Sequence, residues 1–77
     1  MEILNKIAEL AQIGYTVSFK QWVPGFVCME MTYEHYYHSY YALVVIPIKV
    51  PAEYILVLLD EMRIKIDKLV MERKNGN

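Results

Sequence analysis

The residues that could do metal chemistry in this chain gather in one short stretch. His35 and His38 stand three positions apart, with Glu34 beside them and Glu30 and Cys28 shortly before. An imidazole pair at this spacing could share a metal ion in a turn, but a structural zinc site needs four closely spaced ligands. The pattern favours two turn histidines that contact solvent, and we expect neither a metal site nor a cofactor.

Residues for nucleophilic catalysis are present only singly. Such catalysis needs a nucleophile, a base and a group that orients the base, and no motif pairs Ser18, Ser39 or Cys28 with a histidine. The glycines stand alone at positions 14, 25 and 76, so the chain has no Gly-rich phosphate loop. We therefore expect no catalytic residue, and a small enzyme or metal-binding protein is the second alternative function.

Aromatic side chains are the more informative signal. The chain has seven tyrosines, five of them between positions 33 and 41. Exposed aromatic rings suit protein interfaces, and they can also stack on nucleic-acid bases. A protein partner is favoured, because Lys20 is the only Lys or Arg between positions 7 and 48. The predicted partner-binding aromatic face consists of Trp22, Phe26, Tyr36 and Tyr37.

Length and composition predict one small domain with an apolar surface. The 77 residues correspond to a single α+β domain over residues 1–74, and residues 75–77 are expected to form a disordered tail. Hydrophobic residues make up 56% of the chain, which is high for so small an interior, so part of them is expected on the surface or in an interface. Proteins that bind nucleic acid usually have a basic excess, so the net charge of −1 argues against nucleic-acid binding.

Several features predict a cytoplasmic protein. The single cysteine allows no internal disulfide, which fits a reducing compartment. The opening Met-Glu-Ile-Leu lacks the basic start and apolar block of a signal peptide. Residues 40–59 are strongly apolar, but two prolines, a lysine and a glutamate interrupt them, so we expect no membrane-spanning segment.

Hydrophobic periodicity indicates a helix, three strands and a second, longer helix. Alternation marks strands at 15–22 and 26–33, with a third that begins between 37 and 40 and ends at 46. Helical spacing marks residues 2–13 and 50–74. This order predicts an αβββα domain, with a three-stranded antiparallel meander and both helices on one face of the sheet.

Local signals place some boundaries of these elements. Gly14 is well placed as the left-handed cap of the first helix. Pro24-Gly25 is typical of a type II turn, which splays hairpin strands, so we expect a slightly longer loop there. The turn between the second and third strands has no Gly or Pro, and its register stays open. The predicted core consists of Ile7, Leu10, Val17, Phe19, Met29, Ile55, Leu59, Met62 and Ile66.

Two apolar surfaces predict self-association. Residues 40–46 form an edge strand in a meander, yet they include no charge, glycine or proline, and an open edge of this kind recruits other chains. The long helix has a second apolar stripe, at seven-residue spacing, opposite its core stripe. One two-fold contact covering both surfaces would make a homodimer. The predicted interface consists of Tyr40, Ala42, Val44, Ile46, Val57, Ile64 and Met71.

The order helix–strand–strand–strand–helix resembles that of the double-stranded RNA-binding domain. That family has a Gly-Pro-x-His-type loop after its first strand and a lysine cluster at the start of its second helix. Here Val23-Pro24-Gly25-Phe26 and Pro51-Ala52-Glu53-Tyr54 occupy these positions. The resemblance therefore concerns element order, and no RNA-binding residue carries over. In composition the chain is also similar to small open reading frames of phages and mobile elements.

These observations predict a small self-associating protein-binding or adaptor module without catalytic activity, of the kind that phages and mobile elements encode. The partners expected are a second copy of the chain and a further protein. A nucleic-acid-binding αβββα module that uses an aromatic sheet face is the alternative.

Overall fold

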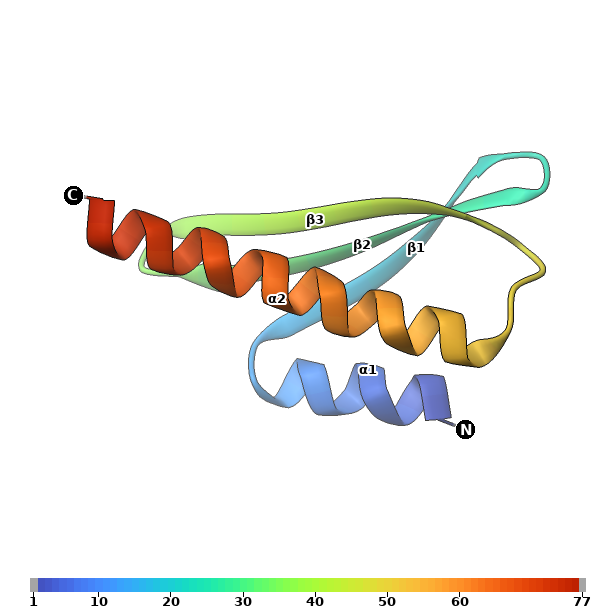
Figure 1. Ribbon diagram of the computed structural model, residues 1–77, viewed down its shortest axis with the longest axis horizontal. Coiled ribbons are helices and arrows are strands. Elements are labelled where there is room, and N and C mark those ends of the chain that lie inside the picture. The colour runs from blue at the N-terminus through green and yellow to red at the C-terminus, as the bar shows by residue number, and fades with distance from the viewer. Residues whose placement is uncertain (1, 77) are drawn as a thin grey trace.

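The computed structural model describes residues 2–76, with side chains through Lys74. It confirms the predicted α+β class and the αβββα order (Figure 1). The elements are α1 (Glu2–Gln12), β1 (Tyr15–Val23), β2 (Phe26–His35), β3 (His38–Pro47) and α2 (Ala52–Gly76).

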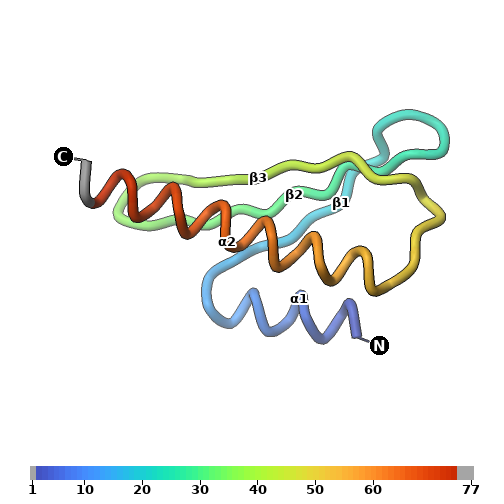
Figure 2. Tube along the Cα trace, viewed as in Figure 1, coloured from blue at the N-terminus to red at the C-terminus, as the bar shows by residue number. Residues whose placement is uncertain are grey.

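The three strands form one antiparallel sheet in the order β1-β2-β3, so β1 and β3 are both edge strands. Tyr33 in the central strand pairs with Tyr15 on one side and with Tyr40 on the other. Both helices pack on the same side of the sheet, α1 beside β1 and α2 against β2 and β3 (Figures 1 and 2). Neither α1 nor α2 covers the opposite face.

The helix ends follow the capping signals with small shifts. Gly14 has a φ of 95°, as expected for the cap of α1, and a Cβ there would stand 3.1 Å from the Tyr33 ring. Helix α2 begins at Ala52, and the N–H of Tyr54 donates to the Pro51 carbonyl. This helix runs to Gly76, two residues past the predicted end, and the last residue of the predicted tail, Asn77, lies outside the described residues.

The first hairpin corrects the expectation of a longer loop. Pro24 and Gly25 alone connect β1 to β2, and Gly25 has the positive φ of 90° that a type II turn requires. The register shifts between Gln21 and Val23, because Gln21 pairs with Val27 but Val23 pairs with Phe26. Trp22 is the extra residue of this β-bulge. The bulge accommodates the splay of the turn within β1, so the loop itself stays short.

The second hairpin closes through two tyrosines. His35 pairs with His38, and Tyr36 and Tyr37 between them have φ angles of 48° and 67°. Two central residues with positive φ are the signature of a type I′ turn, whose twist matches that of the strands. Asn and Gly usually occupy such positions, so the residue types gave no signal of this turn.

The core lies between the inner face of the sheet and the two helices. Leu10, Met29, Leu59, Met62 and Ile66 are buried as predicted, and Ile7, Val17 and Ile55 pack partly buried against them. The prediction was wrong for Phe19, which is 45% exposed, because it lies on the edge strand close to the first hairpin. Tyr15, Met31 and Ala42 also belong to this core and were missing from the prediction. Ile46 is buried as well, and Cys28 is buried on the opposite face of the sheet, where it pairs with Lys20 and Val45.

Removing Leu59 tests how the long helix faces the sheet. This side chain is fully buried in the core, whereas Leu4 on α1 is 60% exposed. Leu59→Ala should lower the free energy of unfolding by about 2–5 kcal/mol, because it leaves a cavity among close-packed neighbours. Chemical denaturation measures the loss. The matched Leu4→Ala change should stay within about 0.5 kcal/mol, and equal losses for the two variants would contradict this facing of α2.

Candidate functional site

Strand β3 presents its unpaired backbone groups at every second residue. A two-residue hairpin loop is flanked by a hydrogen-bonded pair, and such pairs recur at alternate positions along the ladder. His35 and His38 form the first such pair, so even-numbered residues of β3 bond to β2. The N–H and C=O groups that point away from the sheet are therefore those of Ser39, Tyr41, Leu43 and Val45.

The position of Pro47 agrees with this assignment. Proline has no N–H and enters a strand only where that donor would point away from the ladder. Pro47 is the last residue of β3 and pairs with Phe26. As an odd-numbered residue, it stands where an N–H would point away from β2. It therefore interrupts no bond within the sheet, and it marks where the open edge ends.

The two edges of the sheet differ in how they are protected. Edge strands commonly carry a charge or a bulge that prevents another strand from pairing with them. β1 has both, with Lys20 on its outer face and the bulge at Trp22. β3 contains no Lys, Arg, Asp or Glu between His38 and Pro47. The open edge of β3 is therefore the surface of the sheet that is suited to pairing with another strand.

Side chains of β3 alternate between the core and solvent. Among the residues predicted from sequence to form an interface, Ala42 and Ile46 are buried against the helices, and Tyr40 and Val44 are partly buried. Their neighbours Tyr41, Leu43 and Val45 are exposed on the outer face. The exposed apolar side chains of β3 are therefore the odd-numbered ones. They could not be told from the even-numbered ones by sequence, because both sets are apolar.

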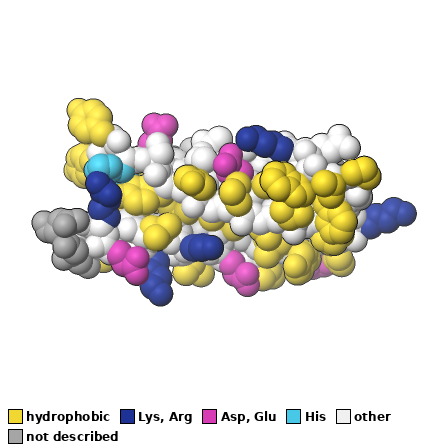
Figure 3. All heavy atoms as spheres, turned by 90° about the horizontal axis from the view of Figure 1, so that it is seen from above, with side chains coloured by type: hydrophobic (Ala, Val, Ile, Leu, Met, Phe, Trp, Pro, Cys, Tyr) yellow, Lys and Arg dark blue, Asp and Glu magenta, His cyan; other side chains and the backbone are white. Residues whose placement is uncertain are grey.

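A shallow groove of about 170 Å³ runs between β3 and α2. One wall is the middle of β3, and the other is the flank of α2 that lies toward that edge. Figure 3 shows the molecule from above, relative to Figure 1. Apolar side chains run along its length there, with charged side chains on either side of them. The groove is lined by Ala42, Leu43, Val44, Leu58, Glu61, Met62 and Lys65.

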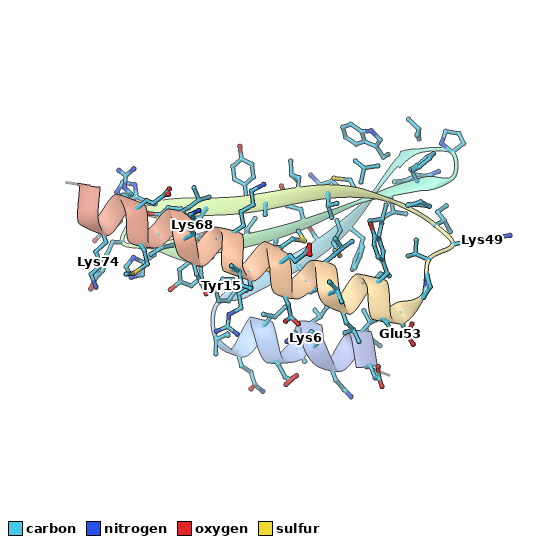
Figure 4. All side chains as sticks on the ribbon, in the orientation of Figure 1. Lys6, Tyr15, Lys49, Glu53, Lys68 and Lys74 are labelled. Atoms are coloured by element: carbon cyan, nitrogen blue, oxygen red, sulfur yellow. The ribbon has the colours of Figure 1, made fainter. Side chains whose placement is uncertain are left out.

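Polar contacts fix the rotation of α2 about its axis. The Tyr15 hydroxyl donates a hydrogen bond to Asp67, and the Arg63 guanidinium lies 5.5 Å from the centre of the Tyr15 ring. Nearer the start of the helix, Lys6 Nζ on α1 lies 2.8 Å from Asp60 Oδ1 (Figure 4). These contacts all lie on the side of α2 toward α1 and β1, so the opposite flank, with Glu61 and Lys65, is directed toward the β3 edge.

The second apolar stripe of α2 lies on a different side again. Val57, Ile64 and Met71 are exposed, and Ile64 stands two residues from the buried Met62 and Ile66, nearly opposite them on a helix. This stripe faces away from the sheet. One two-fold contact beside β3 would leave it uncovered, so the open edge and the stripe are two separate surfaces.

The four residues of the predicted aromatic face are all exposed, but they do not form one face. Trp22 and Phe26 flank the first hairpin turn, whereas Tyr36 and Tyr37 form the second. The ten residues of β2 separate the two turns, a length of roughly 30 Å. The structure thus contains two aromatic ends rather than one aromatic surface.

The histidines lie in a pocket of about 190 Å³ near the second turn. Its walls come from that turn and from the end of α2, with His35, His38, Tyr40, Val70 and Arg73 among the lining residues. His35 stacks on Tyr33, with 5.9 Å between ring centroids. In residues 2–76 no group of three His, Cys, Asp or Glu side chains is arranged to hold a metal ion.

Within the described part of the chain, neither helix combines the length and apolar character needed to cross a membrane.

Fold and site together define a small α+β domain with one open, uncharged sheet edge beside a groove. Comparison of the chain with protein-family models, with curated proteins and with solved structures gave no significant match.

The contact that fixes α2 should be visible in a pH titration. Burial and the hydrogen bond to Asp67 raise the pKa of Tyr15 from 10.0 to about 12, against the opposing effect of Arg63. Because the folded state holds this proton more tightly than the unfolded state, the resulting stability is complete below pH 10.0 and is lost as the pH rises toward 12. NMR of the labelled tyrosine ring measures the pKa. Asp67→Asn should move it back toward 10.0, and an unchanged pKa would contradict the contact.

Proposed function

We propose that this protein is a self-associating binding module that forms a homodimer by pairing the β3 edges of two copies. The observation that carries the proposal is the row of outward N–H and C=O groups from Ser39 to Val45, on a strand without a protecting charge. An antiparallel partner strand would satisfy these groups and extend the sheet from three strands to six.

The side chains of β3 support this pairing on both faces. Tyr41, Leu43 and Val45 are exposed, and cross-strand aromatic and β-branched neighbours stabilise antiparallel sheets by about 0.2–1 kcal/mol a pair. On the inner face, Ala42 and Val44 would meet the same residues of the second copy, so the two cores would join beneath the shared sheet. The β3 residues of the interface predicted from sequence would then line the junction without leaving their own core.

Light scattering at micromolar concentration tests the dimer. The expected mass is twice that of the 9.1 kDa protomer. Leu43→Lys places a charge at the middle of the open edge and should return the mass to that of the protomer. Thr16→Lys adds the same charge to the outer face of the other edge strand and should leave the dimer intact. A wild-type protein of 9.1 kDa would overturn the proposal.

Hydrogen exchange locates the contact on β3. Amides of Ser39, Tyr41, Leu43 and Val45 should be protected at high protein concentration and should lose protection on dilution, because only the second copy bonds them. Amides of the even-numbered residues bond to β2 and should stay protected at both concentrations. Rapid exchange of the odd-numbered amides in a protein of dimeric mass would place the dimer contact elsewhere.

The outer face of the sheet supports the binding part of the proposal. Trp22, Phe26 and Tyr41 are exposed there, and neither helix covers them. Large aromatic side chains with few charges around them suit contact with another protein. In the proposed dimer the outer β3 side chains of the two copies would adjoin, giving a wider apolar surface.

A photo-crosslinking residue distinguishes this outer surface from the dimer contact. Placed at Trp22, away from the β3 edge, it should capture one defined protein other than the chain itself when expressed in its source organism. The same residue at Lys49, in the loop before α2, is the control and should not capture that protein. Equal capture from both positions, or capture of the chain alone from Trp22, would argue against a partner on this face.

A further inference from the structure

We infer that the two-fold axis of this dimer passes beside Leu43, and that Glu61 and Lys65 of one α2 helix pair with Lys65 and Glu61 of the other. This inference rests on the proposed pairing of the β3 edges and adds to it a register and a charged contact that selects the partner.

The strand itself favours an axis at its middle. Only odd-numbered residues of β3 present outward backbone groups, so an antiparallel partner must align odd residues with odd residues. Placing Leu43 opposite its own copy aligns Tyr41 with Val45 of the second copy. Ser39 then meets Pro47, where the missing N–H ends the ladder. This register therefore uses the whole open edge and stops where its donors stop.

On the flank of α2 that lies toward β3, the sequence of side chains is nearly symmetric about one position. Leu58, Glu61, Lys65 and Leu69 lie along this side of the helix. The leucine pair and the Glu–Lys pair share almost the same midpoint, close to Arg63. In an antiparallel arrangement of two such helices, each leucine meets a leucine and each glutamate meets a lysine. Glu61 and Lys65 form no ion pair within the described protomer, so both charges are available to a second copy.

The groove brings the middle of β3 and the middle of the α2 flank together. Leu43 lines it together with Glu61, Met62 and Lys65, so the middle of β3 lies beside the middle of the α2 flank. A single axis can therefore serve both elements. Nothing in the pattern of β3 alone or α2 alone requires this agreement, which is why the groove carries the inference.

The spacing of the layers brings the two helices into contact. Neighbouring strands lie about 4.8 Å apart, and α2 packs against both β2 and β3. A helix beneath the space between these strands therefore lies about one strand spacing from the two-fold axis, which passes just outside β3. The two helix axes would then lie roughly 10 Å apart, the distance at which helices pack. Continuing the sheet across the edge thus makes the α2 contact unavoidable.

A charge-reversal series tests the inference through the dimer dissociation constant, measured by sedimentation. Glu61→Lys and Lys65→Glu should each weaken the dimer at least tenfold, because the symmetry places two like-charged contacts in each variant. The double variant E61K/K65E restores opposite charges and should return to within about threefold of the wild type. Glu9→Lys on α1 and Lys49→Glu in the loop are controls that should have little effect.

Mixing the two single variants gives the sharpest result. A chain with lysine at both positions matches a chain with glutamate at both, so the mixture should form heterodimers in preference to either homodimer. Added salt should reduce that preference. A dimer that tolerates both single changes would overturn the paired α2 contact while leaving the β3 dimer standing. A monomeric wild type would remove the dimer proposal itself.

Discussion

A three-stranded open sheet has two edges, and the free backbone groups on each must meet water, a side chain or another strand. With 77 residues and two helices, this chain covers one face of its sheet and neither edge completely. β1 carries a lysine and a bulge, the usual obstacles to pairing. β3 has only a terminal proline. The rest of the surface chemistry can be understood from this asymmetry, because it leaves one direction in which the sheet can grow.

The helix layer is arranged so that growth in that direction meets no obstacle. Tyr15, held by Asp67 beneath Arg63, ties α2 to β1, and Lys6 ties it to α1 through Asp60. The polar contacts of α2 are thus made on the side away from the open edge. The flank of α2 beside β3 has leucines and charges that form no ion pair within the described residues. Such side chains suit a symmetric contact better than exposure to solvent.

Most of the fold could be predicted from the sequence, because helical spacing, strand alternation and the glycine signals all agree. The facing of β3 could not, since both of its sides are apolar and its turn lacks Gly or Asn. Only the pairing of His35 with His38 fixes which residues face the core. The aromatic residues were predicted as one surface because they are close in sequence, yet a strand carries its two ends apart. The α2 flank was missed because its pattern becomes informative only beside Leu43.

The turn between β2 and β3 adds a last constraint on this site. Tyr36 and Tyr37 hold left-handed φ angles that cost a residue with a Cβ about 1–2 kcal/mol each, and both rings lie in solvent. The T-shaped contact of His35 with Tyr36, at 4.4 Å between centroids, offsets part of that cost. A two-residue loop nevertheless sets the parity of the whole strand, since one residue more or fewer would turn the odd-numbered amides toward β2. The strained turn is therefore what directs the open donors of β3 away from the sheet, and the proposed pairing depends on it.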